Sequence, residues 1–77
     1  MMLMERKYSD KAILLFEDED TYSAYAADAD TLSQELGIMR FVHVRGIPVV
    51  SFANFRLDEY LRVLTSNGHR VAIVNRL

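Results

Sequence analysis

The chain has 77 residues, no cysteine, and nine Lys and Arg against eleven Asp and Glu, which gives a formal net charge of −2. This length predicts one domain, residues 1–77, and the composition is that of an ordinary globular protein. The lack of cysteine excludes disulfides and thiolate zinc sites and favours the cytoplasm, while the acidic balance excludes long-range attraction of nucleic acid.

Residues 1–7 fit a short helical turn or a frayed end. The first four, Met-Met-Leu-Met, are too few for a signal-peptide core or a membrane span, so we expect no targeting segment and no membrane partner.

Residues 12–16 form an aliphatic run that predicts a strand buried on both faces. Asp20 or Thr21 then suits the N-cap of a helix that runs to Leu36, with Gly37 as its left-handed stop.

The second half predicts two more strands, a helix and a final strand. Residues 38–44 and 47–52 are rich in β-branched and aromatic side chains, and the turn Arg45-Gly46 favours a hairpin between them. Asn54 suits the cap of a second helix that ends at Asn67-Gly68, and residues 69–74 predict a last strand before a short tail.

The predicted order, β-α-β-β-α-β, indicates an α+β fold with a mixed sheet. Both helices should pack mainly on one face, because right-handed crossovers place them together. The predicted core contains Ile13, Leu15, Tyr25, Ala29, Leu32, Leu36, Val42, Val50, Leu57, Leu61, Leu64, Val71 and Ile73.

Few residues suggest catalysis or a cofactor. Asp18 and Asp20 have a spacing that can share a divalent cation, but a solvated turn that caps a helix is the favoured interpretation. His43 and His69 lack a recognisable partner, and no serine stands in a triad context. The three glycines are isolated, which excludes a phosphate-binding glycine loop and nucleotide as a partner. We expect no catalytic residue, metal or cofactor.

Basic and aromatic residues gather around the predicted hairpin and second helix. Arg40, His43, Arg45 and Arg56, with Phe41, Phe52 and Phe55 among them, suit phosphate contact and base stacking. The same residues equally suit hairpin packing with solvated arginines, and exposed phenylalanines at this density also suit a protein interface.

Several segments resemble, in order, the N-terminal mismatch-recognition domain of MutS DNA mismatch repair proteins. The resemblance begins with residues 7–16 and continues through Asp20-Thr21-Tyr22-Ser23-Ala24-Tyr25, Asp28-Ala29 and Glu35-Leu36-Gly37-Ile38. It resumes at Gly46-Ile47-Pro48 and ends with Tyr60-Leu61, Leu64, Gly68 and Val71-Ala72-Ile73. It implies the fold of that module and DNA as its partner.

The chain departs from this family where the family reads a mismatch. Thr21 and Ser23 replace the phenylalanine that wedges beside the mispaired base and the glutamate that hydrogen-bonds to it. Acids at 17–19 stand where the family has a basic residue and a glycine. We therefore expect a non-enzymatic, stand-alone module without mismatch reading, in which Arg40, His43, Arg45 and Arg56 make weak, non-specific nucleic-acid contact. A protein-interaction module and a small metal-dependent enzyme using Asp18 and Asp20 are the alternatives.

Overall fold

The structure is a computed structural model that describes residues 12–43 and 45–75. The expected turn in residues 1–7 and the end of the tail lie outside the described residues. The elements in chain order are β1 (Ala12–Asp18), β2 (Thr21–Tyr25), α2 (Ala27–Leu36), β3 (Phe41–Val42), β4 (Pro48–Ala53), the 3-10 turn η1 (Asn54–Arg56), α3 (Leu57–Ser66) and β5 (Arg70–Val74).

The five strands form one mixed sheet in the order β3-β4-β2-β1-β5. β1 pairs antiparallel with β2 and parallel with β5, whereas β4 pairs antiparallel with both β2 and β3. The predicted α+β class, with a mixed sheet and two helices, is confirmed.

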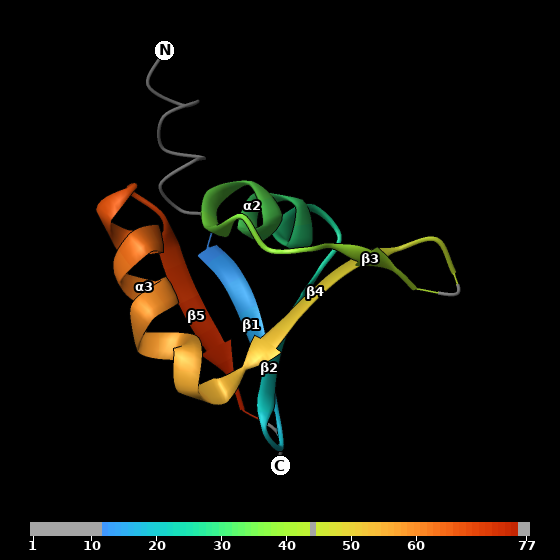
Figure 1. The fold of residues 1–77 in the computed structure, drawn as a ribbon, viewed down its shortest axis with the longest axis horizontal. Helices are drawn as coiled ribbons and strands as arrows, with labels where there is room; N and C mark the ends of the chain where they lie inside the picture. The colour runs from blue at the N-terminus through green and yellow to red at the C-terminus, as the bar shows by residue number, and fades with distance from the viewer. Residues whose placement is uncertain (1–11, 44, 76–77) are drawn as a thin grey trace.

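Both α-helices cover the same face of this sheet, as expected (Figure 1). α2 contributes Ala29 and Leu32 to a single core, and α3 contributes Tyr60 and Leu64. Alternate residues of the strands complete this core: Ile13, Leu15, Ala24, Val50 and Phe52. Within residues 12–43 and 45–75, one layer of helices on one layer of sheet therefore leaves the second face of the sheet without helices.

The prediction of a helix from Thr21 was wrong, because Thr21–Tyr25 is a central strand between β1 and β4. The helix begins only at Ala27, and the break falls at Ala26, whose φ of 58° is incompatible with a continuous α-helix. The Ala26 N–H donates to the carbonyl of Pro48 (2.9 Å), and its own carbonyl accepts from the N–H of Ala29 (3.0 Å). Ala26 therefore joins the sheet to the first turn of α2.

The first strand was expected to be buried on both faces, which the structure contradicts. Ile13 and Leu15 are buried under the helices, but Leu14 is 39% and Phe16 37% exposed on the other face. Three predicted core residues are exposed for related reasons. Tyr25 also points away from the helices, Val42 lies on the short edge strand β3, and Ile73 lies on the edge strand β5.

The other boundaries differ less from the expectation. β3 is only two residues long, because residues 38–40 connect α2 to the sheet without pairing. Asn54 does not cap the second helix: it opens the 3-10 turn η1, and no side chain caps α3. Gly37 has φ 68° and ends α2 in the predicted left-handed conformation, with its N–H donating to the Ser33 carbonyl.

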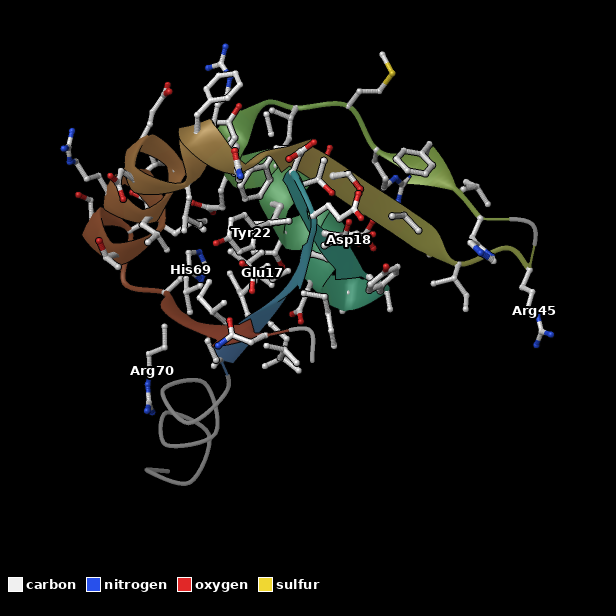
Figure 2. The ribbon with its side chains drawn as sticks, turned by 90° about the horizontal axis from the view of Figure 1, so that it is seen from below. Glu17, Asp18, Tyr22, Arg45, His69 and Arg70 are labelled. Carbon is white, nitrogen blue, oxygen red and sulfur yellow. The ribbon has the colours of Figure 1, made fainter. Side chains whose placement is uncertain are left out.

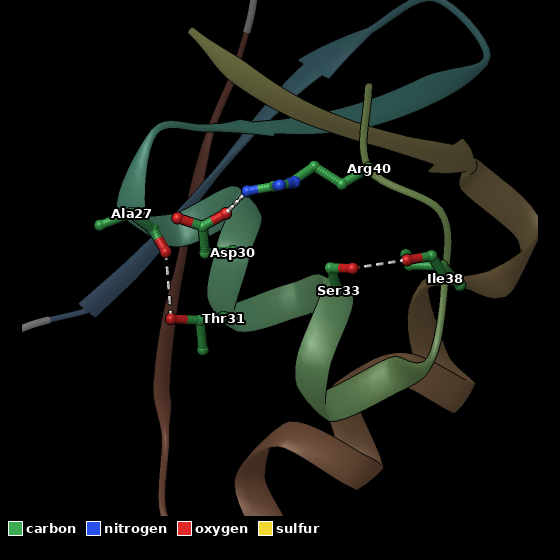
Figure 3. Close-up of polar contacts among 6 residues, drawn as sticks. All are labelled: Ala27, Asp30, Thr31, Ser33, Ile38 and Arg40. Carbon is green, nitrogen blue, oxygen red and sulfur yellow. Dashed lines mark hydrogen bonds and ion pairs between the residues drawn. The ribbon is translucent and has the colours of Figure 1, made fainter. Parts of the chain in front are cut away.

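Side chains of α2 fix the connection that follows it. The hydroxyl of Ser33 donates to the carbonyl of Ile38 (2.8 Å), and that of Thr31 donates within the helix to the carbonyl of Ala27 (3.1 Å) (Figure 3). Arg40 then forms an ion pair with Asp30. These contacts direct the chain from the end of α2 back to the start of β3.

Candidate nucleic-acid interface

The four consecutive acids, Glu17-Asp18-Glu19-Asp20, form the end of the β1–β2 hairpin rather than the entry to a helix. Asp18 is paired with Thr21 across the hairpin, and the Asp18 carboxylate accepts the N–H of Glu19 (3.0 Å). Asp18, Glu19 and Asp20 are exposed to solvent. This turn therefore places a concentrated negative charge at one end of the sheet.

The three residues at the family's mismatch-reading position continue from this turn along β2. Because side chains alternate across a strand, Thr21 and Ser23 point to the face without helices and Tyr22 to the core. The Tyr22 ring packs against Phe52 at 5.9 Å, and Phe52 meets Tyr60 edge-on at 4.9 Å. Tyr22 is thus a core residue, whereas Thr21 and Ser23 stand on the face that a ligand can reach.

Ser23 has little freedom to contact a ligand. Its side chain is 8% exposed, and its hydroxyl lies 2.7 Å from that of Ser51 on the paired strand β4. Beside it, the rings of Phe16 and Tyr25 meet edge-on at 5.5 Å. An open hollow of about 250 Å³ lies next to these side chains. It is lined by Phe16, Glu17, Asp18, Ser23 and Tyr25.

Three of the four predicted basic contacts lie around the β3–β4 hairpin, whose residues 41–43 and 45–48 we call the arm. The His43 N–H donates to the carbonyl of Ile47, and the Gly46 N–H to that of His43, both at 2.8 Å. Arg45 stands in this turn with its side chain directed away from the protein (Figure 2). Arg40, at the base of the arm, is already engaged by Asp30.

Arg56 does not join this group. It follows β4 at the end opposite the arm, and the six residues of β4 separate the two positions by about 20 Å. Its guanidinium group lies 3.3 Å from the Glu59 carboxylate and 6.0 Å above the Tyr60 ring. Arg40, His43 and Arg45 therefore lie along one hairpin and its base, and Arg56 stands apart from them.

Sequence reasoning missed the apolar character of the face without helices. Strand pairing places the side chains of Phe16, Ser23 and Ser51 in one row and those of Tyr25, Val49 and Phe41 in another. We call this surface the open face. Its exposed large apolar side chains are Leu14, Phe16, Tyr25, Phe41 and Val74. The sequence signal for this face was the strand-like alternation in residues 22–25, in which Tyr22 and Ala24 face the core while Ser23 and Tyr25 face away from it.

Metal and membrane sites were also sought in residues 12–43 and 45–75. No group of three or more His, Asp or Glu there is arranged to hold a metal ion. None of the helices in this part of the chain has the length and apolarity needed to cross a bilayer.

Fold and hairpin together define a small α+β module with a β1–β2 hairpin and one open sheet face. The family model described as MutS domain I matches residues 2–77, so the chain belongs to the MutS domain I family. The recognition made from sequence segments is thereby confirmed.

Full-length relatives agree with this assignment. The chain is 36% identical over 76 residues to the DNA mismatch repair protein MutS of Thermosipho melanesiensis, with 99% of this chain covered. It is 38% identical over 71 residues to the protein of the same description from Salinibacter ruber, with 87% covered. The chain spans only 9% and 8% of the length of these two relatives.

Proposed function

We propose that residues 1–77 form one non-catalytic MutS domain I module that contacts nucleic acid weakly and without reading a mismatch. Its setting is the cytoplasm, which the cysteine-free sequence favours. The observation that carries the proposal is the arm, where Arg45 extends into solvent from the turn and the ring of Phe41 is exposed on β3 (Figure 2). An exposed cation and an exposed aromatic ring on one hairpin suit a phosphate and an unstacked base.

The proposed loss of mismatch reading follows from the side chains on β2. Threonine at position 21 offers no aromatic surface to wedge beside a base. Ser23 is short, buried and hydrogen-bonded to Ser51, so it does not replace a carboxylate that reaches a base. The acids of the adjacent turn would also repel a phosphate backbone.

The proposed contact is therefore placed at the arm and not at the β1–β2 hairpin. The arm precedes β4, which runs parallel to β1, whereas the acidic turn follows β1. The two features consequently stand at opposite ends of the sheet. Phosphate approaching the arm encounters Arg45 before it encounters the acids at 17–20.

Fluorescence anisotropy with labelled oligonucleotides tests the proposal, using single-stranded, homoduplex and mismatched DNA at two salt concentrations. Binding should be weak, indifferent to a mismatch, and weakened by salt. Arg45→Gln should reduce the slope of log K against log salt by about one. Arg62→Gln, at an exposed position of α3, is the matched control and should change nothing. Absence of binding at low salt, or a preference for the mismatch, would contradict the proposal.

Protein interaction is the second candidate function, and the exposed apolar side chains favour it. Besides those of the open face, Met39, Val42 and Ile47 are exposed at or beside the arm. Large apolar surfaces of this kind on a small domain commonly mark an interface with another protein.

The metal-dependent alternative is tested by magnesium titration, in which the amide resonances of Asp18 and Asp20 should not move at sub-millimolar metal.

A further inference from the structure

The open face combines apolar side chains with opposite charges at its two ends. Leu14, Phe16, Tyr25 and Val74 occupy neighbouring positions on β1, β2 and β5, and Phe41 extends the surface onto β3. Both helices pack on the other face, and these five side chains are 37–51% exposed. The surface is therefore an apolar layer of the kind that two packed sheets bury between them.

The acidic end is the β1–β2 turn with Asp18, Glu19 and Asp20. The opposite end is basic. Arg70 begins β5 beside Ala12, the first residue of β1, and Arg45 precedes β4, which runs parallel to β1, so both stand at this strand end, at opposite edges of the sheet (Figure 2). Asp28 also lies near this end, but its carboxylate accepts the N–H of Leu14 (3.1 Å). Charge along the strands thus changes from basic to acidic.

We propose that a second copy of this chain covers the open face, with the two sheets face to face and their strands running in opposite directions. The two-fold axis lies between the sheets and perpendicular to the strands. This rotation places the acidic turn of each copy opposite the arm and the start of β5 of its partner. A two-fold interface needs one self-complementary surface, and a face that is basic at one end and acidic at the other meets that requirement.

The size of the face sets the strength of this association. Five strands at about 4.8 Å spacing, all but the two-residue β3 of five to seven residues, give a face of about 20 Å by about 20 Å. This is about 400 Å² per copy, against about 800 Å² for a standard stable interface. The pair should therefore form reversibly, with a Kd between about 10 μM and about 1 mM.

This inference rests on the second candidate function, protein interaction, and is independent of nucleic-acid binding. The two are separable experimentally, because association is measured without DNA and nucleic-acid contact is measured at protein concentrations below the Kd of the pair. A chain that does not self-associate can still contact nucleic acid, and a chain that does not contact nucleic acid can still self-associate.

Sedimentation velocity over a concentration range up to about 1 mM tests the pair. Leu14→Lys places a charge in the middle of the open face and should weaken association at least tenfold. Val63→Lys is the matched control, because Val63 is 37% exposed on α3 and Leu14 39% exposed on the open face. Circular dichroism checks folding, and Val74→Lys replaces Leu14→Lys if that variant does not fold.

Charge exchange tests the orientation of the two sheets. One variant carries Asp18→Lys, Glu19→Lys and Asp20→Lys and becomes basic at both ends, whereas Arg45→Glu with Arg70→Glu makes the second variant acidic at both ends. Each should be monomeric alone, and an equimolar mixture should associate, because both end contacts then join opposite charges. A chain that is monomeric at every concentration overturns the proposal. So does association that survives Leu14→Lys and Val74→Lys, or a charge-exchanged mixture that stays monomeric.

Discussion

The hydroxyls of Ser23 and Ser51 lie 2.7 Å apart on neighbouring strands, and Ser23 is 8% exposed. The Ser23 side chain therefore bonds to the sheet itself. The proposal that this module does not read a mismatch depends in part on this contact.

A double-mutant cycle on these serines should reveal their coupling. Ser23→Ala removes one hydroxyl from a position that is 8% exposed and should cost about 1 kcal/mol of unfolding free energy. Ser51→Ala should cost less, because Ser51 itself is exposed. The double variant should be less destabilised than the sum by about 0.5–1.5 kcal/mol, as measured by urea denaturation. Strict additivity would show that the hydroxyls do not interact.

Leu14 and Leu15 should respond very differently to truncation, although they are adjacent. Leu15 is fully buried beneath the helices, so Leu15→Ala should cost about 2–5 kcal/mol. Leu14→Ala, on the open face, should cost less than about 1 kcal/mol, because most of its lost area is replaced by water contact. Urea denaturation at a protein concentration below the Kd of the proposed pair measures both. Equal costs would contradict the one-sided packing of the sheet.

Replacing Ala26 with glycine should increase the stability of the chain. Its φ of 58° with ψ of −129° is a conformation that residues with a Cβ rarely adopt. Ala26→Gly should therefore stabilise the chain by up to about 1 kcal/mol, through relief of strain that exceeds the entropy cost. Ala27→Gly, in the first turn of α2, is the control and should destabilise by about 0.5–1 kcal/mol. Thermal unfolding of the two variants gives the comparison, and a destabilised Ala26→Gly would refute the strain.

Replacing Asp28 should lower the free energy of unfolding more than replacing Asp30. The Asp28 carboxylate accepts the Leu14 N–H beyond the last residue of β1 that pairs with β2, whereas Asp30 makes an exposed ion pair with Arg40. Asp28→Ala should cost about 1–2 kcal/mol and accelerate hydrogen exchange at the Leu14 amide. Asp30→Ala should cost less than about 0.5 kcal/mol, because both partners of that pair are about half exposed. Unchanged exchange at Leu14 would contradict the assigned hydrogen bond.

Most elements of the fold were readable from local patterns. The aliphatic run at 12–16, the helical spacing before Gly37 and the stripe through Tyr60 and Leu64 each identified an element of the right kind. The error at Thr21–Tyr25 had a physical cause. Tyr25 continues the apolar spacing of α2, so the local pattern fitted a longer helix, whereas pairing with β4, more than twenty residues away in sequence, makes the segment a central strand.

The candidate site was less predictable than the fold. The identity of Thr21 and Ser23 was legible from the sequence, and so was the acidic charge beside them. The sequence did not show that Thr21 and Ser23 share one face of the sheet, because this depends on which face the helices cover. The grouping of Arg40, His43 and Arg45 followed from the hairpin, whereas the separation of Arg56 depended on the direction and length of β4.

The sequence by itself determined the family and the α+β class, because these follow from residue identity and short-range spacing. Tertiary structure alone decided that β2 is a strand, that both helices leave one sheet face open, and that the acids at 17–20 and Arg45 stand at opposite ends of that face. Each of these depends on contacts between segments distant in sequence, and burial is distributed by such contacts rather than by local propensity.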